Sequence, residues 1–103
     1  MAIYKIAENE FAARVEGAKS PVIVDFYADW CGPCKMLLPI LERFAEANPA
    51  VDIFEINVDD APALSEKFGV ESIPTLLLIK DGKEVKRLIG LQNEASLSAL
   101  IAD

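Results

Sequence analysis

The sequence predicts an α/β fold, in which four helices flank a central mixed sheet of five strands. Short β-branched runs alternate with amphipathic segments along the chain, an alternation typical of α/β architecture. The chain has 103 residues, 52% of them hydrophobic and 26% charged, which is ordinary for one globular domain. Near the C-terminus, Asp81-Gly82 separates two apolar runs, and this pair is the strongest short hairpin signal. We therefore expect residues 1–103 to form one domain with the order β-α-β-α-β-α-β-β-α.

The N-terminal part of the chain is expected to form a weak strand and then a helix. The strand is expected over residues 3–6. Residues 9–16 have helical periodicity, and Gly17 after them favours a helix end at this point. The side chains expected to share the buried face of this helix are Phe11, Ala12 and Val15.

The longest predicted helix follows the most apolar predicted strand. Residues 22–27 are apolar on both faces except at Asp25, as expected of a central strand that is covered on both sides. Residues 33–48 then place apolar side chains at helical spacing. Pro33 suits a first helical turn, whereas Pro39 lies in the interior and should kink the helix because it has no N–H.

The remaining elements continue the alternation of strands and helices up to the predicted hairpin. We expect a strand over residues 51–58 and a short helix over residues 61–68. Residues 75–80 and 83–89 are the two hairpin strands, so they must be antiparallel, whereas the first half of the chain favours parallel crossovers. Residues 93–102 close the chain as a helix.

The charge and the composition argue against several functional classes. The formal net charge is −7, which argues against a nucleic-acid partner because phosphate binding needs clustered Lys and Arg. The chain has no histidine, which excludes Ser-His-Asp and Cys-His hydrolases and most zinc and copper sites. No signal peptide is visible, and the apolar runs are much shorter than the roughly 20 residues that span a bilayer. We expect a cytoplasmic protein that does not bind membranes.

Both cysteines lie in one motif, Trp30-Cys31-Gly32-Pro33-Cys34, at a predicted strand-to-helix junction. A zinc site would need two further ligands, and only carboxylates are available for that role. A purely structural disulfide would close a very short loop and would stabilise the fold by only about 2 kcal/mol. A redox-active dithiol is the interpretation we favour, with no metal bound.

The position of the motif assigns different roles to the two thiols. Cys31 precedes the predicted helix, so free N–H groups and the positive end of the helix dipole should stabilise a thiolate on an accessible Cys31 sulfur. Because only a thiolate attacks a disulfide, Cys31 is the expected nucleophile. Cys34, in the first turn, would then resolve the mixed disulfide by closing the Cys31–Cys34 bond.

The chain resembles the thioredoxin family over essentially its whole length. The joint spacing of the matching segments is highly specific, whereas an isolated CxxC motif would be a weak signal. The matching segments are Val24-Asp25-Phe26, Trp30-Cys31-Gly32-Pro33-Cys34-Lys35-Met36, Pro39, Ile73-Pro74-Thr75-Leu76-Leu77-Leu78, Asp81-Gly82 and Gly90. The resemblance implies the thioredoxin fold.

Asp25 is a carboxylate in the middle of an apolar strand, where ionisation without a partner is costly, so its pKa should be raised. One interpretation is a structural carboxyl with satisfied hydrogen bonds. The resemblance favours the other, in which Asp25 accepts the proton of Cys34 during resolution, and the lack of histidine leaves few other candidates.

Glu55 departs from the family pattern, because thioredoxins typically have a lysine at this strand position near the buried aspartate. A second carboxylate there would raise the pKa of Asp25 further and would couple the two titrations. Alternatively, Glu55 turns to solvent and has no effect. The residues leave both possibilities open.

The resemblance also implies a substrate-docking rim around Cys31. By base rate alone the Ile73–Pro74 bond would be trans, but the resemblance implies a cis bond that faces the cysteines and leaves the backbone of Ile73 free for an extended substrate strand. Trp30 could instead be a core residue, and Gly90 is either a strand-end bulge or a point of close approach. The expected rim residues are Trp30, Gly32, Pro33, Ile73, Pro74 and Gly90.

The resemblance implies a monomeric protein-disulfide reductase. Its implied electron donor is thioredoxin reductase, a flavin enzyme that uses NADPH, and its substrates are disulfide-containing proteins. The chain has no dinucleotide-binding fingerprint, so we expect no bound cofactor. Two alternatives remain: a thiol oxidase or isomerase of a more oxidising compartment, and a non-catalytic module that binds a partner through the same rim.

Overall fold

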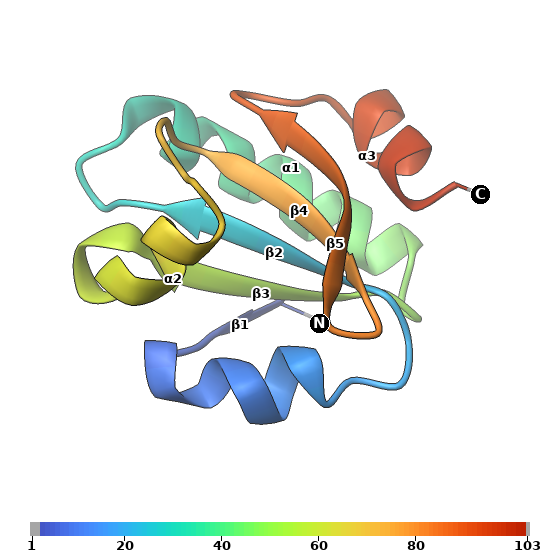
Figure 1. Ribbon diagram of the computed structural model, residues 1–103. Helices are drawn as coiled ribbons and strands as arrows, with labels where there is room; N and C mark the ends of the chain where they lie inside the picture. Colours follow the sequence, from blue (N-terminus) through green and yellow to red (C-terminus); the bar gives the residue numbers. More distant parts are fainter. Residues whose placement is uncertain (1–2, 103) are drawn as a thin grey trace.

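The computed structural model describes residues 3–102, and these form one mixed sheet of five strands with helices on both faces (Figure 1). The strands are β1 (Ile3–Lys5), β2 (Val22–Tyr27), β3 (Asp52–Asn57), β4 (Thr75–Lys80) and β5 (Lys83–Ile89). Their lateral order is β1-β3-β2-β4-β5. β3 pairs in parallel with β1 and β2, whereas β4 is antiparallel to β2 and β5. The predicted mixed α/β sheet is confirmed.

Helical segments occur in each of the four predicted regions, and a further short one follows β3 where no helix is predicted. They are η1 (Glu8–Glu10), η2 (Ala12–Glu16), α1 (Gly32–Ala47), η3 (Val58–Asp60), α2 (Pro62–Lys67) and α3 (Glu94–Ile101). η1, η2 and α2 cover one face of the sheet, and α1 and α3 cover the other (Figure 1). Parallel neighbours need such crossovers, because a tight turn can join only antiparallel strands.

Two large apolar clusters hold these layers together. On one face, Phe11 and Leu64 pack against sheet residues that include Phe26. On the other face, Leu41 and Leu97 pack against sheet residues on the opposite side of the pleat. The three central strands β2, β3 and β4 are largely buried on both faces because each face is covered by helices, whereas the edge strands β1 and β5 are mostly exposed.

A third and smaller cluster lies beyond the end of β2. We call it the cysteine cluster, and its buried members are Ala28, Cys31 and Cys34, with Tyr27, Val58 and Ile73 packed against them. Its buried members belong to neither large cluster, but Val58 and Ile73 also pack against the cluster that contains Phe11 and Leu64.

The first helix differs from the prediction of a regular helix over residues 9–16. It is a short 3₁₀ segment followed by a π-helical segment, in which the N–H of Gly17 donates to the Ala12 carbonyl at 2.9 Å. The wider turn keeps Phe11 and Val15 buried but leaves Ala12 exposed, so the prediction that Ala12 lies on the buried face is wrong. The end at Gly17 is confirmed.

The hairpin prediction is confirmed in detail. Asp81 and Gly82 have φ angles of 53° and 77°, and two positive values are what the two-residue hairpin turn requires.

The last helix begins after Asn93, whose side chain accepts a hydrogen bond from the N–H of Ser96 at 2.8 Å. Pro39 lies inside α1, and the kink expected there stays a prediction.

Candidate redox site

The Cys31–Cys34 pair lies at the junction between β2 and α1 and forms a disulfide, with the two Cα atoms 5.2 Å apart. Cys31 is the N-cap of α1 and has extended backbone angles, whereas Cys34 lies in the first helical turn. Pro33, near the start of the helix, has no N–H and a φ already suited to it. The spacing therefore places both sulfur atoms at the N-terminal end of α1.

The backbone around Cys31 favours negative charge on its sulfur. The N–H of Cys34 donates to Cys31 Sγ at 3.2 Å, so the sulfur occupies the place of a capping oxygen. The free N–H groups of a 16-residue helix also carry a partial positive charge at this end. Both effects would stabilise a thiolate at Cys31 in the reduced protein.

The two cysteines face different surroundings. Cys31 and Cys34 are 5% and 7% exposed, so the accessible Cys31 sulfur expected from the sequence is not seen in the disulfide form. Cys31 Sγ lies 3.8 Å from the carbonyl oxygen of Ile73. Cys34 instead lines a cavity that it shares with Asp25. The cysteines therefore differ in their neighbours rather than in their exposure.

Trp30 lies on the surface beside the cysteines. It is 70% exposed, so the alternative that it is a core residue is wrong. Its Nε1–H donates to Asp59 Oδ2 at 2.9 Å, and the N–H of Asp59 donates to the Asn57 side chain at 2.9 Å. A chain of hydrogen bonds from the end of β3 therefore holds the indole in place.

The other expected rim residues come from two further loops. Gly32 and Pro33 are exposed, Ile73 is half-buried, and the Ile73–Pro74 bond is cis, as the resemblance implies. Pro74 is buried, so its ring contributes little surface, but its carbonyl accepts a hydrogen bond from the N–H of Gly90 at 2.8 Å. This bond joins the Ile73–Pro74 turn to the end of β5.

Gly90 is explained by its backbone conformation. It is half-buried and has a φ of 89°, a value that side chains with a Cβ rarely adopt. The register shift of this sheet edge lies between Leu78 and Ile79, so Gly90 is not the bulge that the sequence left open. Among the described residues, nothing lies within 4 Å of the position that a Cβ would take, so its surface is open to a partner.

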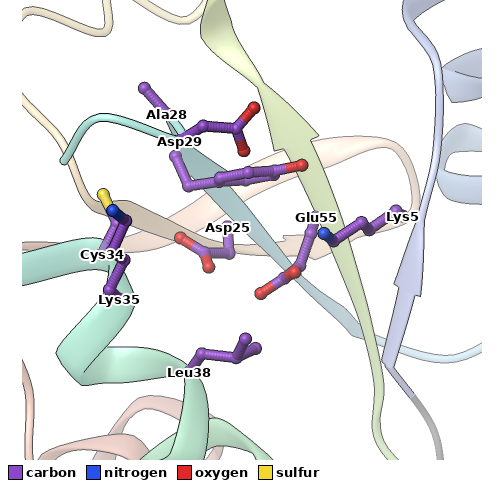
Figure 2. Close-up of a pocket in the computed structure, with 9 residues that line it drawn as sticks. Lys5, Asp25, Ala28, Asp29, Cys34, Lys35, Leu38 and Glu55 are labelled. Carbon is purple, nitrogen blue, oxygen red and sulfur yellow. The ribbon is translucent and has the colours of Figure 1, made fainter.

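Asp25 and Glu55 are both buried and face each other. They are directly opposite one another on β2 and β3, and they are 2% and 4% exposed. The alternative in which Glu55 turns to solvent is therefore wrong. In Figure 2 the Asp25 carboxyl lies between Cys34 and Glu55, and Lys5 extends toward Glu55. The cavity of about 400 Å³ is lined by Lys5, Asp25, Tyr27, Ala28, Asp29, Cys34, Lys35, Leu38 and Glu55.

Burial and mutual repulsion alter the titration of the two acids. Burial raises the pKa of Asp25 well above its ordinary value, and the charge of Glu55 and a hydrogen bond with Glu55 raise it further. Burial also raises the pKa of Glu55, but the hydrogen bond with Asp25 and the charge of Lys5 oppose that rise. Asp25 Oδ1 is buried and has no hydrogen-bond partner among residues 3–102.

Two residues at the site were not predicted from the sequence. Asp59, which holds Trp30, lies 29 residues away in the chain, and nothing in its local pattern indicates the contact. Lys5 is opposite Glu55 in the β1–β3 register. It could have been found only by combining the predicted strands with their lateral order.

Other kinds of site were also considered. Within residues 3–102 there is no cluster of three or more cysteine and acidic side chains placed to hold a metal ion. No helix in the same part of the chain is both long and apolar enough to cross a membrane.

Comparison with known proteins identifies the family. The Thioredoxin family model matches residues 2–103. The thioredoxin of Chlamydia muridarum is 50% identical over 97 residues, which cover 94% of this chain and 93% of the relative. The thioredoxin of Alicyclobacillus acidocaldarius is 48% identical over 99 residues, covering 95% and 93%. That of Mycobacterium tuberculosis is 43% identical over 103 residues, covering 99% and 89%.

These matches agree with the fold and with the chemistry of the site. The five-stranded sheet places a CxxC disulfide at a helix N-terminus, beside a cis-proline turn and a buried acid. A dithiol in this setting can exchange electrons with another disulfide. By fold, by site and by sequence, the chain belongs to the thioredoxin family of thiol–disulfide oxidoreductases.

Proposed function

We propose that this chain reduces protein disulfides, with Cys31 as the nucleophile and Cys34 as the resolving thiol. The observation that carries the assignment is the hydrogen bond from the N–H of Cys34 to Cys31 Sγ at the N-cap of α1. The Cys31 thiolate attacks one sulfur of the substrate, and the other sulfur leaves as a thiolate. Cys34 then attacks Cys31 Sγ, which releases the second substrate thiolate and leaves the Cys31–Cys34 disulfide.

Asp25 accepts the proton that Cys34 loses in the second step. The carboxyl group and Cys34 line the same cavity, and the unpartnered Asp25 Oδ1 is free to take a proton directly or through one water. A buried carboxyl with a raised pKa is suited to this role, because it binds a proton more strongly than an ordinary carboxyl group does.

Substrates dock on the rim around Cys31. Trp30, Gly32, Pro33, Ile73 and Gly90 supply surface that is largely uncharged, and Pro74 holds the Ile73 turn against the end of β5. An extended substrate strand can pair with the backbone of Ile73, a short form of β-augmentation. Recognition through backbone would allow many different protein disulfides as substrates.

The oxidised protein is recycled by thioredoxin reductase. This partner is a flavin enzyme that takes its electrons from NADPH, while the chain itself binds no cofactor and works as a cytoplasmic, single-domain monomer. With NADPH, such a reductase and a disulfide protein, we expect NADPH oxidation to depend on this chain, followed as loss of NADPH absorbance. If the chain instead oxidises a reduced protein under these conditions, the proposed direction is wrong.

Selective alkylation tests the assignment of the two thiols. When the reduced protein reacts with a limiting amount of iodoacetamide, we expect Cys31 to be labelled first because its sulfur carries the stabilised charge. Peptide mass spectrometry identifies the labelled residue, and urea-unfolded protein is the control in which both thiols should react alike. Faster labelling of Cys34 in the folded protein would contradict the proposal.

A further inference from the structure

Three ionisable side chains form a row across adjacent strands. Lys5 on β1 is opposite Glu55 on β3, and Glu55 is opposite Asp25 on β2. All three line the cavity that also contacts Cys34 (Figure 2). The row therefore runs from the resolving thiol to a surface lysine, and its two middle members are buried carboxyl groups.

The proposed reaction uses Asp25 but leaves Glu55 without a role. Taking a carboxyl group from water into the protein interior is costly, so a buried glutamate needs a partner. Glu55 shares a hydrogen bond with Asp25, and no other hydrogen bond of its side chain is found within residues 3–102. Two carboxyl groups can share such a bond only when one of them carries a proton.

The charges around the pair decide which carboxyl group holds the shared proton. Burial and the charge of Glu55 raise the pKa of Asp25, whereas the hydrogen bond with Asp25 and the nearby Lys5 favour the ionised form of Glu55. The strand register points the same way, because Glu55 has the cation Lys5 opposite it on β1, whereas Asp25 lies between Glu55 on β3 and Leu76 on β4. With one proton on the pair, Asp25 therefore holds it and donates to an ionised Glu55. Asp25 Oδ1 remains unpartnered and buried in this arrangement.

A protonated Asp25 can take a further proton only if it gives one away. Building on the proposed function, we infer that Asp25 and Glu55 form a proton relay, in which Asp25 receives the Cys34 proton while it passes its own proton to Glu55. Glu55 is the group that gains the proton. It acts through Asp25 and does not touch the reacting sulfur atoms.

The step balances in atoms and charge. The S–H bond of Cys34 breaks, its sulfur forms a bond with Cys31 Sγ, and the substrate thiolate leaves with the electron pair of the broken disulfide bond. One proton enters Asp25 and one leaves it for Glu55, so the carboxyl pair changes from singly charged to neutral. Glu55 then returns the proton to solvent at the Lys5 end of the cavity, where Lys5 is exposed.

Other ionisable groups also face the relay. Tyr27 and Asp29 come from β2 and the loop after it, Lys35 and Glu42 from α1, and Lys5 from β1. Of these groups, Lys5 and Glu42 shift the pKa of Glu55, both through their charge. Glu42 raises the pKa of Glu55 through its charge alone, which makes Glu42→Gln a matched control.

The two steps of the reaction can be timed separately with an aromatic disulfide that releases a coloured thiolate. The first equivalent reports attack by Cys31, and the second reports resolution by Cys34. In the wild-type chain the second phase should lose rate at acid pH when Glu55 becomes protonated. In Glu55→Gln, Asp25 is the only carboxyl group left, so it must itself be ionised before it can accept the Cys34 proton. Because burial raises the pKa of Asp25, we expect the loss of rate at acid pH (the acid limb of the second phase) to begin about one pH unit higher than in the wild-type chain.

The direction of this shift separates the relay from a simpler role of Glu55. If Glu55 only repelled charge on Asp25, its removal would lower the pKa of Asp25 and would move the acid limb down. A downward shift or no shift therefore overturns the relay. The first phase should keep its pH profile. Glu42→Gln removes only a charge that raises the pKa of Glu55, so it should move the acid limb slightly down, opposite to the shift expected for Glu55→Gln. Thermal unfolding checks that both variants are folded.

A direct measurement of protonation gives a second test. In a carboxyl-carbon NMR titration of the wild-type chain, we expect Asp25 to lose its proton at a higher pH than Glu55, and the reverse order overturns the relay. The Asp25→Asn variant separates this inference from the proposed function. A second phase that stays fast in Asp25→Asn refutes the role of Asp25 itself, whereas a slow one, together with an unshifted Glu55→Gln profile, refutes only the relay.

Discussion

Replacing Cys34 with serine is expected to stop the reaction at a covalent complex between Cys31 and the substrate. Cys31 keeps its N-cap position and its backbone N–H donor, so it can still attack a disulfide. A serine hydroxyl cannot resolve the resulting mixed disulfide under these conditions. One equivalent of substrate thiol should be released, and the other should stay attached to the protein until an added dithiol removes it.

Replacing Cys31 with serine should instead abolish reduction completely. No attacking thiolate remains at the helix N-terminus, and Cys34 is directed toward the inner cavity. Intact-protein mass spectrometry and turnover of a protein disulfide compare the two variants. A covalent complex that forms through Cys34 in Cys31→Ser, at a rate comparable to the wild-type chain, would reverse the proposed roles. Sustained turnover in either variant at a rate comparable to the wild-type chain would contradict a dithiol mechanism.

The second large effect is expected from Asp25→Asn, which should stabilise the fold and slow resolution. The raised pKa of Asp25 means that the folded chain binds this proton more tightly than the unfolded chain does. Above the ordinary value of 3.8, the unfolded chain releases the proton while the folded chain keeps it. Wild-type stability therefore falls by about 1.4 kcal/mol for each pH unit, up to the raised pKa.

Asparagine has no such titration, and its amide can still donate to Glu55. The advantage of Asp25→Asn should therefore be smallest at about pH 4 and should grow as the pH rises toward neutrality. Urea unfolding of the oxidised protein at several pH values measures this difference. A difference that is constant with pH would mean that Asp25 titrates as it does in the unfolded chain.

The same substitution removes the proton acceptor of Cys34. Loss of a general base typically costs about 10²-fold or more, and the deficit should narrow as the pH approaches the ordinary thiol pKa of about 8.5. The release of the second coloured thiolate measures this rate, and attack by Cys31 in the same trace is the internal control. Equal resolution rates in Asp25→Asn and the wild-type chain from about pH 6 to 9 would contradict the role of Asp25.

Elements whose signals are local could be predicted from the sequence. The hairpin at Asp81-Gly82 depends on two adjacent residues, and the long helix depends on a repeat that its own residues contain. The first helix was less predictable, because regular and widened turns bury the same Phe11 and Val15. Whether a 3₁₀, α- or π-helical turn forms depends on which carbonyl accepts each backbone N–H, and the spacing of apolar residues does not show this.

The site could be predicted only in part, because several of its contacts join distant segments. The CxxC motif is contiguous, so its position at a strand-to-helix junction could be read directly. The orientation of Glu55 depends on the register between β2 and β3, and the contact of Trp30 with Asp59 depends on where a separate loop lies. Strand patterns give the order of elements along the chain, but they leave open their lateral order in the sheet.

The position of the two cysteines outside the large clusters matters for the lifetime of the protein. An electron carrier is both a reactant and a product of its own cycle, so its fold must survive many rounds of oxidation and reduction. The covalent bonds form and break at Cys31 and Cys34, which belong to neither large cluster. The covalent changes of each cycle are therefore made at the N-terminal end of α1, and the packing of the two large clusters can stay the same in the oxidised and the reduced chain.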